Sequence, residues 1–284
     1  MKRKNDYRIG EFLFRFYRKR SASFLANIYK SGITGAPKDI HRARLDVKKI
    51  LAIVDLLRIV RSKAEKDPGY DKIFKRLYRA SGKIREIQVN QLLLTRSEFL
   101  AYDLTLFKQD LLKMERERTR EFLDVIRKFD EHKLARIEKR INKEVEEITP
   151  VTLQKKTNRY IRSKIALSLN LLEKGDNEKN IHEARQHVKE LSTVLSLVFS
   201  IKPTDKLELV IDGLNRSEMV IGDWHDKVVL AEAFERFLKQ HRDADENQMT
   251  QIRECHQTLC EANTGQIESI VRDVRRAILS EPHL

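Results

Sequence analysis

Two ten-residue stretches of the sequence carry a histidine, an arginine and a lysine at the same spacing. Residues 41–50 read HRARLDVKKI, and residues 182–191 read HEARQHVKEL, 141 positions further along a chain of 284. On a helix, residues at i, i+3 and i+7 share one narrow face. Each stretch therefore forms a stripe of three basic groups. Cations stacked so closely repel one another unless an anion lies along them, so the chemistry that the stripes favour is the binding of an extended anion.

The first basic stripe consists of His41, Arg44 and Lys48, and the second consists of His182, Arg185 and Lys189. An apolar helix face runs beside each stripe: Ala43, Val47, Ile50 and Val54 in the first copy, and Ala184, Val188, Leu191 and Leu195 in the second. The alternative is that the arginines and lysines extend from the edge of the core and pair with acids. We favour anion binding because the stripes recur while their neighbours change.

The elements that must hold these stripes are helices. Lys, Arg, Glu, Leu and Ile are abundant, Gly and Pro are few, and no alternating strand pattern is evident. The prolines lie at the edges of apolar-periodic segments, as expected of helix ends. The sequence predicts helices over 6–30, 38–64, 70–97, 99–148, 151–173, 179–200, 205–239 and 246–279. We therefore predict an all-α protein, with four helices in each half of the chain forming a four-helix bundle.

The repetition extends beyond the stripes. Residues 80–94 align with residues 220–234, and the alignment pairs Gly82 with Gly222. Glycine inside a helix costs about 1 kcal/mol, so its recurrence indicates a bend or a close approach of another group; an inherited helix break is the alternative. We predict an internal duplication.

The charge is unevenly distributed. The chain carries a net charge of +14, but residues 1–90 contribute +15 and the remainder contributes −1. Residues 151–170 hold five basic residues and no acid. Segregated charge of this kind indicates a polyanionic partner, although a basic face that only aids solubility is the simpler alternative.

The two basic stripes and the two glycine-containing segments make four motifs, and their order along the chain resembles that of the CHAD family, whose members carry a conserved histidine in an α-helical domain. The motifs read His41-x-x-Arg44-x-x-x-Lys48-Lys49, Gly82-x-x-Arg85-Glu86, His182-x-x-Arg185-x-x-x-Lys189 and Gly222-x-x-His225-Asp226. The resemblance covers essentially the whole chain. It implies one CHAD domain over residues 1–284, built from halves 1–149 and 150–284 that are related by a pseudo-twofold axis. It also implies a basic cavity between the halves that binds inorganic polyphosphate without catalysis.

The candidate polyphosphate ligands come from the motifs and from the basic segments around them. They are His41, Arg44, Lys48, Lys49, Arg85, His182, Arg185, Lys189, Arg18, Arg79, Arg159 and Arg162. The chain departs from the family pattern where Glu190 follows Lys189 and where Glu86 follows Arg85.

Two other functions deserve comparison with polyphosphate binding. Residues 12–20, which read FLFRFYRKR, interleave aromatic and basic side chains, and nucleic-acid bases could stack on such aromatics. However, Phe12 and Phe16 are spaced i, i+4, which is typical of a core-facing pair. The dipeptide His225-Asp226 is used by metal-dependent phosphohydrolases, but the sequence offers no second His-Asp dipeptide to complete such a site.

The remaining features set the context. Cys255 and Cys260 form neither a disulfide framework nor a zinc motif, and no apolar run reaches the length of a membrane span. The basic N-terminus is followed by a segment too charged for a signal peptide. We expect a cytoplasmic protein, associated with polyphosphate granules, that has no cofactor, no bound metal and no membrane partner. Its partner is inorganic polyphosphate or a similar polyanion, and a monomer is plausible.

Overall fold

The computed structural model describes residues 4–61, 69, 71–173, 178–241 and 246–279. The regular elements in these ranges are all helices, so the predicted all-α class is confirmed. They are α1 (Lys4–Thr34), α2 (Pro37–Val60), α3 (Asp71–Leu93), the short 3-10 helix η1 (Ser97–Phe99), α4 (Thr105–Arg127), α5 (Glu131–Val145), α6 (Pro150–Glu173), α7 (Glu178–Ile201), α8 (Asp205–Gln240) and α9 (Glu246–Leu279).

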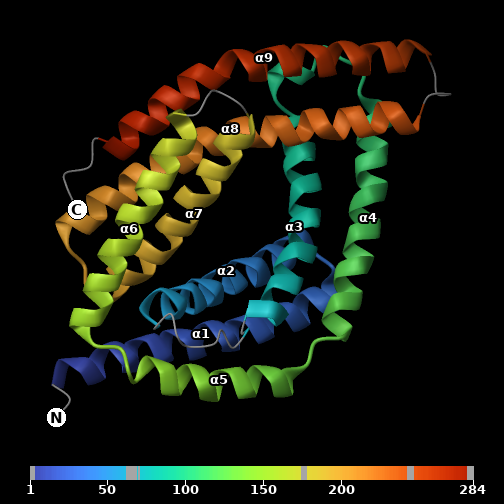
Figure 1. The fold of residues 1–284 in the computed structure, drawn as a ribbon. Helices are drawn as coiled ribbons and strands as arrows, with labels where there is room; N and C mark the ends of the chain where they lie inside the picture. The colour runs from blue at the N-terminus through green and yellow to red at the C-terminus, as the bar shows by residue number, and fades with distance from the viewer. Residues whose placement is uncertain (1–3, 62–68, 70, 174–177, 242–245, 280–284) are drawn as a thin grey trace.

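Helices that follow one another in the chain pack in pairs: α1 with α2, α3 with α4, α6 with α7, and α8 with α9. Figure 1 shows the α3–α4 pair and the α6–α7 pair both reaching from the layer of α1, α2 and α5 to the long α8–α9 pair. Contacts also run between the predicted halves, where α2 packs against α7 and α3 packs against α8. The residues of the four motifs lie on these last four helices.

Three clusters of buried apolar side chains hold the pairs together. One cluster is centred on α1, α2 and α3 and includes residues of α4 to α7. A second joins the end of α3, η1 and the start of α4 to α8 and α9. The third fills the space among α6, α7, α8 and α9, where the buried Trp224 donates a hydrogen bond to the carbonyl of Asn263 at 3.3 Å. The second cluster therefore draws on both predicted halves, and the division of the chain at residue 149 stays a prediction, as does the internal duplication.

The prediction of one helix over residues 99–148 is wrong, because the chain turns between α4 and α5. Asp130 is the N-cap of α5, and its carboxylate accepts hydrogen bonds from the backbone N–H groups of His132 and Lys133. The preceding Phe129 turns inward and its ring lies edge-on to Phe24, with centroids 5.4 Å apart. An aspartate at an N-cap is a normal helix start. Neither proline nor glycine marks this turn, which is why the apolar period alone did not reveal it.

Candidate functional site

The two basic stripes lie on neighbouring helices, α2 and α7, which pack against each other. The apolar faces predicted beside the stripes are buried on both helices. Their burial fixes how each helix is rotated, and it leaves the stripes at the edge of the core. The arginine and the lysine of each stripe are half-buried, His182 is also half-buried, and His41 is exposed.

Lys189 is the group at which the two stripes meet. Burial, together with the positive charges of Arg185, Lys48 and Arg44, lowers the pKa of its ammonium group to about 8, while the charge of Glu218 acts in the opposite direction. Two of these three cations belong to the other stripe. Groups that lie 141 residues apart in the sequence therefore share one electrostatic environment.

Arg44 is fixed against α3 by contacts other than ion pairs. Its Nη1 donates a hydrogen bond to the backbone carbonyl of Tyr78 at 2.7 Å, and its Cζ lies 3.8 Å from the centre of the Tyr78 ring. A Cβ atom on Gly82 would lie 3.2 Å from the same Nη1. The glycine of the second motif thus permits the close approach of the arginine of the first. Gly222 has nothing within 4 Å of a Cβ position, so the close approach predicted for both glycines applies to Gly82 alone.

Arg85 extends the first stripe onto α3. Partial desolvation of the His41 ring lowers its pKa, although the residue as a whole is exposed, and the charges of Arg85 and Arg44 act in the same direction. Burial also raises the pKa of Asp226 on α8, whereas the charges of Arg185 and Arg85 oppose that rise. Arg85 is therefore electrostatically coupled both to the first stripe and to the fourth motif.

The fourth motif contributes His225 from α8. Its ring lies beside that of His182, with centroids 5.0 Å apart. Burial lowers the pKa of His225 to about 4, and the charges of Arg185, His182 and Lys189 act in the same direction. His225 is consequently neutral at pH 7 in the unliganded protein.

We call the coupled basic residues of these four helices the central basic cluster: His41, Arg44, Lys48, Arg85, His182, Arg185, Lys189 and His225. Five of its cations have no carboxylate within ion-pair distance in the described part of the chain, namely Arg44, Lys48, Arg85, Arg185 and Lys189. Such an arrangement concentrates positive charge on a partly desolvated surface, where it attracts anions more strongly than in open water.

The two acidic departures from the family pattern are used as ion-pair partners. Glu190 accepts a hydrogen bond from Lys164 of α6 at 2.6 Å, and Lys164 also lies 2.9 Å from the Nδ1 atom of His187. Glu86 of α3 pairs with Arg236 of α8 at 3.7 Å. Both acids tie neighbouring helices together at the margin of the cluster. Sequence reasoning missed Lys164 as a partner of Glu190, although the basic run over residues 151–170 contained it.

The other sequence-predicted ligands lie outside the central basic cluster. Arg18 pairs with Glu138 of α5 at 3.3 Å, and Arg79 lines a cavity between α3 and α4. Arg159 and Arg162 are exposed on α6, and Lys49 is exposed on α2. None of these residues is among the groups that shift the pKa of Lys189 or of His225.

Two observations bear on the alternative functions, which are nucleic-acid binding at residues 12–20 and metal-dependent phosphate hydrolysis at His225 and Asp226. Leu13 and Tyr17 are fully buried, and Phe14 and Phe16 pack against the same core cluster, so these side chains serve the core. Phe12 stacks on Phe16 with centroids 6.3 Å apart. Within the described residues, no group of three or more His, Cys, Asp or Glu side chains is placed to hold a metal ion. The absence of catalysis stays a prediction.

A solved structure shares this arrangement of helices. The chain matches the crystal structure of the CHAD domain from the plant Ricinus communis with a TM-score of 0.70, over 97% of this chain and 93% of that one, at 13% sequence identity. The chain has the fold of a CHAD domain. The CHAD fold predicted from the four motifs is therefore confirmed. No family model matches the sequence, and no curated protein matches it either. None of the described helices combines the length and the apolar character that a membrane span requires.

Proposed function

We propose that the CHAD-like chain binds inorganic polyphosphate, or a closely similar polyanion, along the central basic cluster and does not hydrolyse it. The observation that carries the proposal is the meeting of the two stripes at Lys189, whose pKa is lowered to about 8. The lowered pKa reports desolvation of the ammonium group first and repulsion by the neighbouring cations second, and a bound anion would offset both. A chain of phosphates suits the cluster because its charges are closely spaced along a line, as are those of the stripes.

The proposal gives each stripe half of the binding surface. A single exposed ion pair contributes only about 0–1 kcal/mol, so two cations on one helix hold a flexible polyanion weakly. Cations on opposed helices act on the same phosphates, and partial burial lowers the dielectric around them. A basic cavity between the halves, a cytoplasmic location and association with polyphosphate granules belong to this proposal.

The test replaces Arg185 and Lys189 with alanine, because these residues have no structural ion pair to lose. Arg44 is unsuitable for it, since its bond to Tyr78 also supports the fold. We expect the double variant to lose long-chain polyphosphate binding by at least tenfold in a fluorescence titration. The matched control replaces Arg272 and Arg276, two exposed arginines of α9, and should bind like the wild type. Equal loss in both variants would mean that net charge, and not the cluster, determines binding.

The absence of turnover is tested separately. The protein is incubated with polyphosphate and Mg²⁺, and released phosphate is compared with a control without protein. We expect no difference. Phosphate release that disappears on changing His225 or Asp226 would instead establish the hydrolase alternative.

A further inference from the structure

A second concentration of positive charge lies on a different face of α3. Lys72, Lys75, Arg76, Arg79 and Lys83 follow one another at i, i+3, i+4, i+7 and i+11, which places them on one helical stripe. All five are exposed. Tyr78, Gly82 and Arg85, which serve the central basic cluster, lie on another face of the helix by the same periodicity. The stripe was present in the sequence, but no motif repetition drew attention to it.

These residues line a cavity of about 560 Å³ between α3 and α4. Among the described residues that line it, the acid is Glu121, which is already paired with Arg118 at 2.6 Å and with Lys83 at 3.7 Å. Lys72, Arg76 and Arg79 have no carboxylate within ion-pair distance in the described part of the chain, so their positive charge is left uncompensated there.

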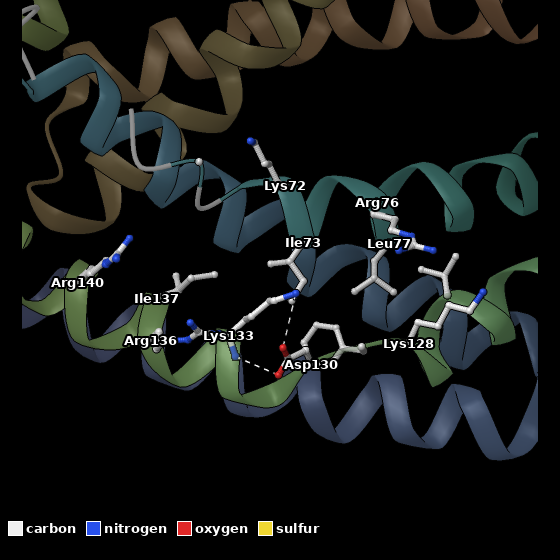
Figure 2. Close-up of a pocket in the computed structure, with 13 residues that line it drawn as sticks. Lys72, Ile73, Arg76, Leu77, Lys128, Asp130, Lys133, Arg136, Ile137 and Arg140 are labelled. Atoms are coloured by element: carbon white, nitrogen blue, oxygen red, sulfur yellow. Dashed lines mark hydrogen bonds and ion pairs between the residues drawn. The ribbon is translucent and has the colours of Figure 1, made fainter. Parts of the chain in front are cut away.

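A neighbouring cavity of about 460 Å³ continues the surface around the corner between α4 and α5 (Figure 2). The two cavities share Lys72, Arg76 and Val125. The second cavity adds four cations, Lys128, Lys133, Arg136 and Arg140. The acid in its described lining, Asp130, caps α5 and pairs with Lys133 at 3.6 Å. We call the two cavities together the outer basic groove.

The floor of the outer basic groove is apolar. Five side chains form it at the corner: Ile73, Leu77, Val125, Phe129 and Ile137. Figure 2 shows Ile73 and Leu77 pointing from α3 toward α5, with cationic side chains on both sides. Apart from Leu77, which is buried, these residues are half-buried, so part of their apolar surface meets solvent. An occupant with both phosphates and flat apolar groups would use the rim and the floor together.

We propose that the outer basic groove binds single-stranded nucleic acid. The phosphates would lie along the arginines and lysines of the rim, and bases would cover the apolar floor, which is how single strands are held without sequence preference. Inorganic polyphosphate has no group that can use the floor. The uncompensated cations extend through two adjoining cavities, which suits a strand better than a single nucleotide. This proposal does not depend on polyphosphate binding at the central basic cluster.

The first test measures binding of a labelled oligouridylate of about 12 nucleotides, within the range that single-strand sites cover. Arg76→Gln combined with Arg136→Gln removes one cation from α3 and one from α5. Neither residue has a carboxylate within ion-pair distance in the described ranges, so the fold should be preserved. We expect at least a tenfold loss of affinity at low salt. The slope of log K against log salt concentration should fall by about 1.4, because each lost phosphate contact on a single strand removes about 0.7.

Two comparisons make the test decisive. Arg272→Gln with Arg276→Gln on α9 changes the net charge equally, and should leave affinity and slope unchanged. If it weakens binding as much as the groove variant does, the groove is not the site. The second comparison uses an abasic oligonucleotide with the same number of phosphates, which we expect to bind several-fold more weakly. Equal affinity for both oligonucleotides would overturn the role of the floor and, with it, nucleic acid as the ligand.

The two proposed sites can fail independently. Arg185→Ala with Lys189→Ala should retain binding of the oligouridylate while polyphosphate binding is lost. The groove variant should show the reverse pattern. Loss of oligouridylate binding in the Arg185 and Lys189 variant, with no loss in the groove variant, would assign the nucleic acid to the central basic cluster and overturn the present proposal.

Discussion

At the scale of single residues, Lys189 shows that the central basic cluster is arranged at the expense of stability. Its pKa lies at about 8 in the folded protein, against an ordinary value of 10.5. The unfolded chain therefore binds more protons than the folded chain between pH 8 and pH 10.5, and stability rises with pH through that window. Below pH 8 both states are protonated, and the full cost of holding the charge in the cluster is present.

This cost predicts that Lys189→Met stabilises the unliganded protein. One pKa unit corresponds to about 1.4 kcal/mol, and the partial exposure of the side chain reduces the full value, so we expect a gain of roughly 1–2 kcal/mol at pH 7. The gain should disappear well above pH 10.5, where the wild-type lysine is neutral in both states. Urea unfolding at the two pH values measures it. A variant that is less stable at pH 7 would show that the ammonium group is stabilised by its surroundings.

The residue scale also separates what the sequence could predict from what it could not. The two stripes and their apolar faces followed from helical periodicity, because a buried face fixes the rotation of its helix. The contact of Arg44 with the carbonyl of Tyr78 had no such signal, since every residue carries a backbone carbonyl. The sequence also could not show which candidate ligands form ion pairs outside the cluster. Arg18, for example, pairs with Glu138, and the two residues lie 120 positions apart on α1 and α5.

At the scale of elements, helix existence was predictable and the turns were less so. Pro37 and Pro150 begin α2 and α6, as their positions indicated. The predicted helices over 70–97 and 99–148 place a boundary at residue 98, but the interruption runs from 94 to 104. Its extent was missed because its apolar residues continue the helical pattern. Two of them, Leu94 and Phe99, are instead buried in the second core cluster. Tertiary packing decided these turns, and local composition did not.

The approach of α1 to the end of α5 gives a prediction at this scale. A Cβ atom at Gly10 would lie 2.6 Å from the backbone carbonyl oxygen of Val145, which cannot rotate away. Gly10→Ala should therefore force the helices apart and destabilise the protein by about 1–3 kcal/mol. Gly222→Ala is the matched control, because that position is open and alanine should add about 0.5–1 kcal/mol of helix stability. Urea midpoints of the two variants that shift in the same direction would contradict this explanation.

At the scale of the whole molecule, the contacts of α2 with α7 and of α3 with α8 bring the four motifs together. The sequence indicated this convergence only through the repetition and the family resemblance, because periodicity describes one helix at a time. The sequence contained the second basic stripe of α3, but it did not indicate that this stripe would face α4 and α5. One helix thus supplies both proposed binding surfaces, with Arg85 on one face and Arg76 on the other.

Because the motifs lie close together, polyphosphate binding should be coupled to the uptake of protons by the cluster. In the empty cluster Lys189 is charged below a pKa of about 8. A bound phosphate chain favours the charged form and raises that pKa. Between pH 8 and the higher pKa of the complex, binding must take up a proton, so affinity falls as pH rises through this range. His225, with a pKa of about 4 when the cluster is empty, gives the corresponding effect on the acidic side: a bound anion raises its pKa, and affinity increases on acidification.

We therefore expect the affinity for long-chain polyphosphate to be nearly flat from pH 7 to pH 8 and to decline by up to tenfold per pH unit from there to about pH 9.5. Calorimetric titrations at pH 9 in two buffers with different ionisation enthalpies should show uptake of close to one proton by the wild type. The Lys189→Met variant should bind polyphosphate more weakly at pH 7 and take up far less than one proton on binding at pH 9. Its affinity should show little of the decline above pH 8 that the wild type shows. A wild-type affinity that stays constant up to pH 9.5 would show that Lys189 does not touch the anion, and that the two stripes do not share a ligand.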